Sequence, residues 1–226
     1  MGSEFANRID VELNDSMHYK VKCSRGHEEV FTLETTRYTL LFDFGVLALR
    51  SGFYREAVSN FAASLERFYE FFARVICHHQ GISFEQVELA WKGVSAQSER
   101  QLGAFLFLYL SELKSAAPMI KDSQVRFRNQ VVHKGYIPTK KETLDYARYM
   151  HDYMISLLEV LDSNYYASMW DVFVEERVVA VQRNPVFGVV NFQSFSCVPN
   201  VYYRYKKSVT FDDKLSDPSI SSWLFP

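Results

Sequence analysis

The sequence predicts a mainly α-helical protein, a helical bundle of about five helices with short β-strand segments towards both its N- and C-termini. Three observations support this fold class. Apolar residues recur at three- and four-residue steps through the centre of the chain, they alternate with polar residues near the N-terminus, and β-branched and aromatic residues gather past about residue 170. With 226 residues, 48% of them hydrophobic, the chain can bury a substantial core.

The first 36 residues are expected to contain a β-hairpin segment. Residues 1–5, MGSEF, have the composition of an expression-vector remnant and are not expected to belong to the fold. Over residues 6–36, the stretches RIDVEL (8–13), HYKVKC (18–23) and EVFTLET (29–35) alternate in polarity as half-buried strands do. SRGHE separates the last two stretches and is typical of a turn.

Residues 37–168 are expected to form the helical domain. The first helix, TLLFDFGVLAL (39–49), is apolar on nearly all sides, as a buried helix is, and ends at Ser51-Gly52. Residues 53–76 then form the clearest amphipathic helix in the chain. Its apolar positions follow one another at three- and four-residue steps: Phe53, Ala57, Phe61, Leu65, Phe68, Phe72 and Ile76.

Capping signals indicate where the later helices begin. Ser83 precedes a helical stretch over 84–93 and has Gln86 three residues on, as in a capping box. Thr139 stands in the same relation to Glu142, at the start of a long helix that we expect to continue to about residue 166.

Two further helices are predicted between these capping signals. One covers 98–116 and stops before Pro118. The other covers about 122–134, where Gly135 ends it.

Residues 169–226 are predicted to be a β-rich extension. VFVEERVVAVQ (172–182), FGVVNFQSFSC (187–197) and NVYYRYKKSVTF (200–211) are rich in β-branched and aromatic residues. Asn184-Pro185 and Pro199-Asn200 are turn signals between them. We also expect the two terminal segments to pair in one small sheet.

Cysteine content and hydropathy bear on the compartment. Three widely spaced cysteines, Cys23, Cys77 and Cys197, do not suggest a disulfide framework, and a reducing cytoplasm is the simplest location. No uncharged apolar run of about 18 residues predicts a membrane-spanning helix. Cys23 and His27 have the spacing of half a zinc site, but no second pair of ligands accompanies them, so we expect no metal.

The net charge of −2 argues against a surface coated in positive charge for non-specific nucleic-acid binding. Residues 121–141 are nevertheless the densest positive stretch, with one acid, Asp122. The stretch is either a solvated helix face or a local basic cleft. Its cations are Lys121, Arg126, Arg128, Lys134, Lys140 and Lys141.

Within this stretch, RFRNQVVHKGY (126–136) carries the candidate chemistry. At about 100° per residue, Arg126, Asn129 and His133 share a helix face, and Arg128 must reach around to join them. An imidazole, an amide and a guanidinium at one helix end can move a proton and stabilise an anion. The alternative is a helix end in which His133 and Lys134 interact with the last carbonyls.

The residues from Arg128 to His133, R-N-x-x-x-H, resemble the R-[N/H/D]-x-x-x-H form of the R-x(4–6)-H motif of the HEPN superfamily (higher eukaryotes and prokaryotes nucleotide-binding). The resemblance covers about residues 37–165 and includes EAVSNFAASLERFYEFF, which is similar to the family's second helix. It implies a helical bundle that acts as a metal-independent endoribonuclease without a cofactor. Such proteins belong to toxin–antitoxin, abortive-infection and CRISPR defence systems.

Roles follow from the resemblance residue by residue. His133 would be the acid or base, Arg128 the phosphate clamp, and Asn129 the polar residue that supports the site. Arg126 fits the longer spacing of the motif, so which arginine is primary stays open. Tyr136 is similar to a tyrosine just past the motif in some toxins, although this chain has H-x-x-Y where they have H-x-Y. The residues expected to bind RNA are Arg126, Lys134, Tyr136, Lys140 and Lys141.

The reaction implied is attack by a ribose 2′-OH on its neighbouring phosphate, which leaves a 2′,3′-cyclic phosphate and a 5′-OH. The expected partners are RNA and a second copy of the chain, with an antitoxin or another defence-system protein as a further partner. The alternative is a catalytically silent HEPN-like module that binds RNA or protein.

Overall fold

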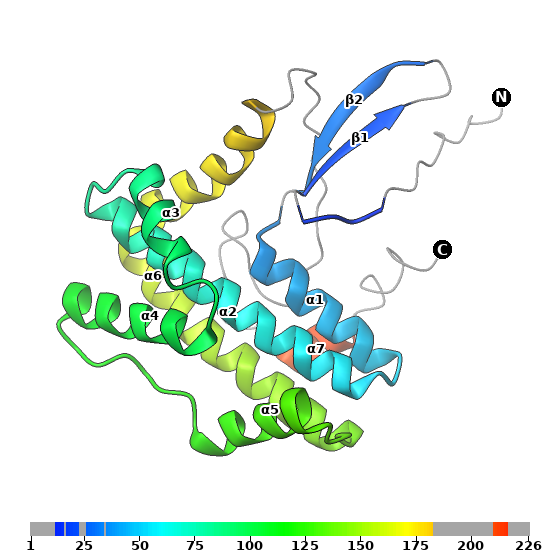
Figure 1. Ribbon diagram of the computed structural model, residues 1–226. Coiled ribbons are helices and arrows are strands. Elements are labelled where there is room, and N and C mark those ends of the chain that lie inside the picture. Colours follow the sequence, from blue (N-terminus) through cyan, green and yellow to red (C-terminus); the bar gives the residue numbers. More distant parts are fainter. Residues whose placement is uncertain (1–11, 16, 23–25, 34, 183–209, 217–226) are drawn as a thin grey trace. The chain divides into compact units, whose positions relative to one another are not determined.

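The computed structural model describes residues 12–15, 17–22, 26–33, 35–182 and 210–216 (Figure 1). The described residues are mainly α-helical, as the sequence predicts, with seven helices and one two-stranded sheet. The chain divides into two compact units. The described part of one unit is the β-hairpin with the end of α6 from Phe173 onwards. The other contains residues Thr36–Val172 and α7.

The β-hairpin pairs β1 (His18–Lys22) with β2 (Glu28–Thr32) in antiparallel orientation. Lys20 lies opposite Val30 in the register. These two strands and the turn between them confirm the prediction for HYKVKC and EVFTLET. The predicted strand RIDVEL is not confirmed, because its described residues, 12 and 13, are not in a strand and the rest lie outside the described ranges.

The helical unit is built around α2 (Tyr54–His79). Helix α1 (Arg37–Arg50) packs along it, and a Cβ on Gly45 would stand 2.5 Å from the ring of Phe61, so only glycine permits this approach. The hydroxyl of Ser64 donates a 2.6 Å hydrogen bond to the carbonyl oxygen of Tyr38, which joins the two helices in the core.

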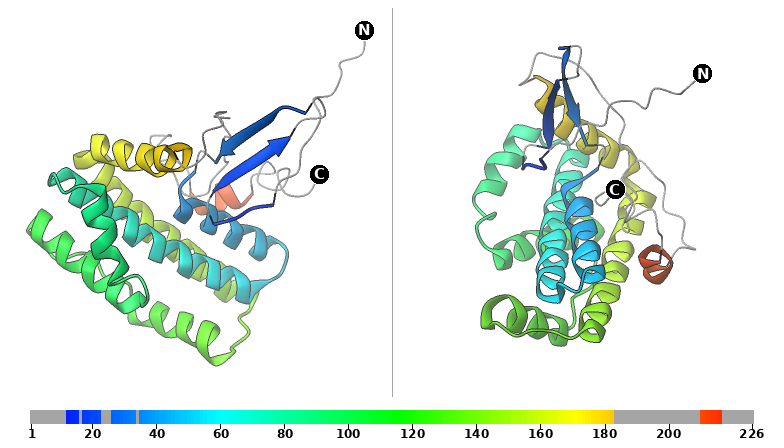
Figure 2. Two further views of the ribbon diagram at one scale, coloured as in Figure 1. Left: turned by 45° about the horizontal axis from the view of Figure 1, so that its top comes forward. Right: turned by 90° about the vertical axis from the view of Figure 1, so that its right-hand side faces the viewer.

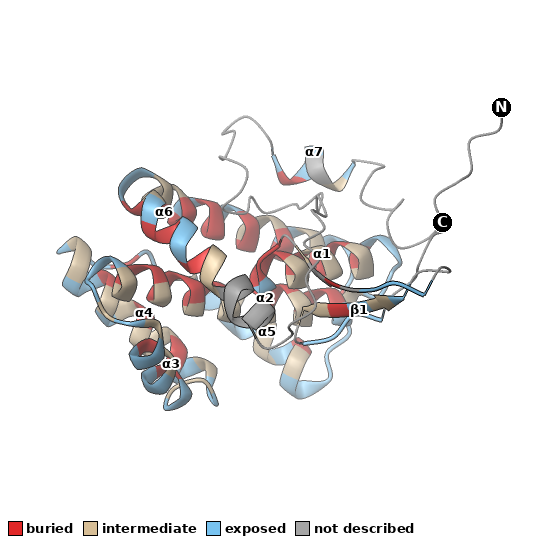
Figure 3. Ribbon diagram, turned by 90° about the horizontal axis from the view of Figure 1, so that it is seen from above, coloured by how far each residue is buried: buried red, intermediate tan, exposed pale blue. Residues whose placement is uncertain are grey.

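Three shorter helices also pack against α2: α3 (Phe84–Lys92), α4 (Ser98–Leu113) and α5 (Asp122–Lys134). Helix α6 (Lys140–Gln182) joins the same core, since the hydroxyls of Tyr69 and Tyr153 lie 3.2 Å apart across α2 and α6. Figure 2 shows these helices from two further sides. In Figure 3, α6 carries buried residues on one side and exposed residues on the other, whereas α1 is buried or half-buried along nearly its whole length. The amphipathic pattern therefore predicted which faces form the core.

The predicted capping signals are confirmed. The hydroxyl of Ser83 accepts a hydrogen bond from the amide of Gln86. Thr139 and Glu142 form a reciprocal capping box, in which the Thr139 amide donates to the Glu142 carboxylate at 2.8 Å and the Glu142 amide donates to the Thr139 hydroxyl at 3.2 Å. Gly135 ends α5 in the left-handed conformation, with φ of 71°.

The predicted β-rich extension is wrong wherever residues 169–226 are described. VFVEERVVAVQ continues α6 to Gln182, past a non-helical Tyr165, and α7 (Phe211–Leu215) follows further on. Met169, Val172 and Phe173 are buried at helical spacing. Extending an existing helix needs no new nucleation, so β-branched residues continue it despite their preference for strands. FGVVNFQSFSC and most of NVYYRYKKSVTF, with their pairing to the N-terminal segment, lie outside the described residues.

Helix α7 is anchored to the helical unit by an aromatic contact and an ion pair. Phe211 is buried and contacts the rings of Phe42 and His151, at centroid distances of 6.1 and 5.6 Å. Asp212 accepts hydrogen bonds from the guanidinium of Arg148, the shortest at 2.8 Å. Among the described helices, none is long and apolar enough to cross a membrane.

Candidate functional site

Helix α5 presents most of its side chains to solvent. Val131 is its only buried residue, and the rest of the helix is half-buried or exposed. A helix with so little apolar area cannot be held by packing alone. Its polar side chains must therefore supply part of its attachment to α2.

Arg128 is the centre of a hydrogen-bond network at this helix. Its Nη1 lies 2.9 Å from Nε2 of His133 and donates to Oδ1 of Asn129 at 3.0 Å. Its Nη2 donates to Oε1 of Glu66, on α2, at 3.0 Å. The structure thus brings together the three residues of the motif and adds a carboxylate from another helix.

The contact between Arg128 and His133 defines the state of the imidazole. A guanidinium only donates hydrogen bonds, so Nε2 of His133 must accept, and the proton of the neutral ring lies on Nδ1. His133 is exposed, whereas the side chain of Arg128 keeps 20% of its accessible surface. Nε2 is unprotonated, but its one lone pair accepts from Arg128, so it can take a proton from a bound reactant only when this contact opens.

Glu66 is a site residue that sequence reasoning missed. It lies 62 positions before Arg128, in a helix assigned to the core, and its side chain is 28% exposed. Its helical neighbours at i−4 and i+3, Ala62 and Tyr69, are both buried. A carboxylate between two buried positions of an amphipathic helix needs a cationic partner. The position of Glu66 between two apolar positions of α2 is therefore the signal in the sequence that could have identified it.

An aromatic layer lies next to the network. Tyr146 on α6 is buried, and this burial raises the pKa of its phenol far above the ordinary value; the charge of Arg128 lowers that pKa and the charge of Glu66 raises it. Phe127 contacts the rings of Tyr146 and Tyr136, at 5.4 and 6.5 Å. Because the phenol of Tyr146 stays neutral, it adds no second charge beside the Arg128–Glu66 pair.

Two of the residues predicted to bind RNA are engaged at the start of α6 instead. The hydroxyl of Tyr136 donates to Oε1 of Glu142 at 2.8 Å, and this bond raises the pKa of the tyrosine. Nζ of Lys141 lies 2.8 Å from Asp145. Both side chains are exposed, so a ligand could reach them only in competition with these partners.

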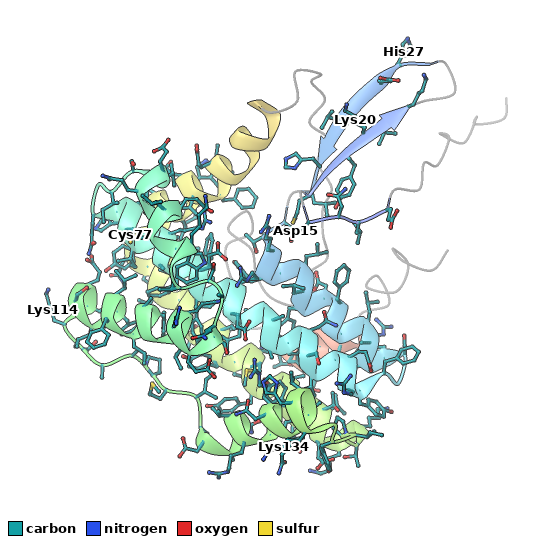
Figure 4. All side chains as sticks on the ribbon, in the orientation of Figure 1. Asp15, Lys20, His27, Cys77, Lys114 and Lys134 are labelled. Carbon is teal, nitrogen blue, oxygen red and sulfur yellow. The ribbon has the colours of Figure 1, made fainter. Side chains whose placement is uncertain are left out.

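Arg126, Lys134 and Lys140 are exposed and have no polar side-chain partner among the described residues. Figure 4 shows Lys134 on the outer side of α5. Arg126 shares a helix face with Asn129 and His133, as predicted, but makes no hydrogen bond to either. Arg128 reaches His133 from another face of the helix, so the arginine that contacts the histidine is the one with the poorer helical alignment.

No cluster of three or more His, Cys, Asp or Glu side chains suited to a metal occurs in the described ranges. His27 is exposed, and Cys23 lies outside those ranges. Cys77 is a half-buried free thiol whose pKa is raised by burial.

No protein-family model matches the chain, and no match is found among curated proteins or solved structures.

Proposed function

We propose that this protein is a metal-independent endoribonuclease that acts through Arg128, Asn129 and His133. The observation that carries the proposal is the single guanidinium that bonds His133, Asn129 and Glu66 at once. This network fixes the position of the imidazole and places the proton of the neutral ring on Nδ1, so Nε2 is the basic nitrogen and becomes free when its bond to Arg128 opens. A resemblance to HEPN nucleases, carried by the same residues, points to the same chemistry.

The proposed reaction begins when the hydrogen bond from Nη1 of Arg128 to Nε2 of His133 opens, which frees the lone pair of Nε2 to take the proton of a ribose 2′-OH. The 2′ oxygen then attacks the adjacent phosphorus, the bond to the 5′ oxygen breaks, and the products are a 2′,3′-cyclic phosphate and a 5′-OH. Arg128 is the cation closest to the imidazole, so its charge stabilises the negative charge that develops on the phosphate oxygens. Asn129 holds Arg128 in place through its Oδ1.

Substrate contacts are proposed for the cations without a partner. Arg126 precedes the motif residues 128–133 in the sequence, and Lys134 and Lys140 follow them. All three side chains are exposed, so they can bind backbone phosphates on either side of the cut. A nucleophile that belongs to the ribose restricts the substrate to RNA, since DNA lacks the 2′-OH.

The leaving 5′ oxygen needs a proton, and each chain offers one histidine at the site. We therefore include a second copy of the chain, which would supply the acid, in the proposal. A role in a bacterial toxin or antiphage defence system, with an antitoxin or similar partner, belongs to the same proposal. The cytoplasm is the proposed location, because three widely spaced cysteines without the pattern of a disulfide framework suit a reducing compartment.

One observation favours a second candidate, a catalytically silent module that binds RNA or protein. Both terminal nitrogens of Arg128 already have partners inside the chain, so the arginine could serve only to attach α5 to α2. In that case the exposed cations would bind RNA without cleaving it.

Cleavage of mixed RNA in the presence of EDTA tests the proposal. Wild-type protein should produce 2′,3′-cyclic phosphate and 5′-OH ends, and His133→Ala and Arg128→Ala should not. The matched controls are His79→Ala, an exposed histidine at the end of α2, and Arg55→Ala, an exposed arginine of α2. Cleavage by His133→Ala at the wild-type rate would reject the nuclease, and RNA binding without cleavage by the wild type would support the silent module.

A further inference from the structure

Helix α4 has an apolar face on each of its two sides. One face is buried against α2 through Phe105 and Tyr109. On the opposite face, Phe107 keeps 75% and Leu110 keeps 47% of their accessible surface. Leu106 and Leu113 are half-buried beside them. Helix α4 thus exposes an apolar stripe from Gly103 to Leu113, about 15 Å long, where a helix on the surface of a monomer usually carries polar side chains.

Gly103 lies in this stripe, one helical turn before Phe107. A Cβ added there would meet no atom within 4 Å, so nothing within the described chain requires a glycine at this position. Its backbone has no left-handed φ that would favour glycine. A glycine inside a helix is unfavourable by about 1 kcal/mol relative to alanine, which makes its presence here a feature to be explained. It leaves a hole in the exposed stripe beside the large side chains of Phe107 and Leu110.

The stripe is complementary to a second copy of itself in antiparallel orientation. Two helices related by a two-fold axis between residues 106 and 107 place Leu106 of one against the partner's Phe107. The same register places Leu110 over the hole at the partner's Gly103. It also places Glu99 beside the partner's Lys114. Leu106 and Phe107 thus pack on each other at the centre, Leu110 fills the hole at Gly103 on either side, and opposite charges meet at both ends of the stripe.

The charges of the stripe support this register. Glu99 stands in the first turn of α4 and Lys114 at its C-cap. Neither has an ion-pair partner among the described residues; the Glu99 carboxylate accepts a hydrogen bond from the Ser98 hydroxyl at 3.3 Å, and the Lys114 ammonium donates to the carbonyl oxygen of Ser111. Figure 4 labels Lys114 at the end of α4. The antiparallel arrangement also brings the positive end of each helix dipole close to the negative end of the other.

We infer that the outer face of α4 is the surface through which two copies of this chain associate. The occupant is a second copy because a single register covers the exposed apolar residues, fills the glycine hole and brings Glu99 and Lys114 of opposite chains together. The inference rests on α4 alone and would hold if the proposed nuclease chemistry were wrong.

Sedimentation of the full chain from about 1 to about 200 µM tests the inference. We expect a dimer, and Phe107→Asp should raise its dissociation constant at least about 30-fold, because a carboxylate would be buried at the centre of the interface. The control is Phe53→Asp, the same change at a phenylalanine that is 62% exposed before α2. A monomeric wild type, or a dimer that Phe107→Asp does not weaken, would overturn the inference.

Charge reversal tests the register. Glu99→Lys and Lys114→Glu should each weaken the dimer, because like charges then face each other, and the double variant should restore it. Each reversal is unfavourable for the helix dipole of its own chain, so the restoration cannot come from a more stable helix. A double variant weaker than either single variant would overturn the antiparallel pairing.

Gly103→Leu distinguishes specific packing from general stickiness. It adds apolar surface, so non-specific association would increase, whereas the two-fold packing loses the hole for the partner's Leu110 and should weaken. A stronger dimer would reject the proposed packing.

RNA cleavage by the same variants separates this inference from the proposed function. A monomeric Phe107→Asp that cleaves RNA at the wild-type rate would leave the α4 surface established and remove the need for a second copy in the reaction. A dimeric wild type without cleavage would leave the α4 surface standing and reject the nuclease.

Discussion

Helices α4 and α5 both pack against α2, but they are attached to it by different interactions. Helix α4 buries the aromatic rings of Phe105 and Tyr109 against Phe72. Helix α5 buries one valine and is joined to α2 by the ion pair of Arg128 with Glu66. One helix is therefore held by apolar area and the other by a polar network whose groups are also those of the candidate site. The consequence is that substitutions in α4 should act on stability first, and those in α5 on the site as well.

The largest expected loss of stability comes from a substitution on the buried face of α4. Phe105 is fully buried and stacks on Tyr69 at 4.5 Å, so Phe105→Ala should lower the free energy of unfolding by about 3–5 kcal/mol. Chemical denaturation at low protein concentration measures it. Phe107→Ala, on the exposed face of the same helix, is the control and should change stability by less than about 0.5 kcal/mol. Equal losses in the two variants would contradict the assignment of the faces.

The polar attachment of α5 should have a smaller effect. Glu66→Gln removes the charge opposite Arg128 but keeps the shape of the side chain, and we expect a loss of about 1–2 kcal/mol because both partners are partly buried. A double-mutant cycle with Arg128→Ala measures the coupling. The exposed pair of Lys141 with Asp145 is the control, and Lys141→Ala should change stability by at most about 0.5 kcal/mol. No coupling between Glu66 and Arg128 would show that apolar contacts alone hold α5.

Replacing a glycine with alanine should change the free energy of unfolding in opposite directions at the end of α5 and within α4. Gly135 has a φ of 71°, so Gly135→Ala forces a side chain into the left-handed region and should cost about 1 kcal/mol. Gly103 has open space around it within α4, so Gly103→Ala should stabilise the monomer by about 0.5–1 kcal/mol. Thermal unfolding at a concentration below that of dimer formation compares them. A loss of stability in both variants would mean that Gly103 has a role inside the monomer.

The smallest expected effect on stability concerns the capping box of Thr139 and Glu142 at the start of α6. Hydrogen bonds from the backbone and hydroxyl of Thr139 lower the pKa of Glu142, with a further contribution from the hydroxyl of Tyr136. Because the folded-state pKa is lowered, the stabilisation is present above the ordinary glutamate value of about 4.3 and is lost as the pH falls through the lower folded value. Glu142→Gln should flatten this part of the pH profile of stability. An unchanged profile between about pH 5 and pH 3 would show that the carboxylate contributes nothing to the cap.

Patterns within one helix were predictable because they depend on neighbours three and four positions apart. The amphipathic repeat of α2, the capping box of Thr139 with Glu142, and the glycine stop at Gly135 were all read correctly from the sequence. The end of α6 was not, because β-branched residues after Val172 favour strands in isolation. An already formed helix continued through them without a new nucleus.

The sequence by itself determined the mainly helical fold, the boundaries of most helices and the place of the R-N-x-x-x-H motif at a helix end. Only the tertiary structure decided that Glu66, 62 positions away, faces Arg128, and that Arg128 rather than Arg126 contacts His133. It also decided which of the apolar sides of α4 stays exposed. The physical reason is range: helix formation and capping are settled by contacts within a turn or two, whereas an ion pair between helices depends on how two surfaces pack.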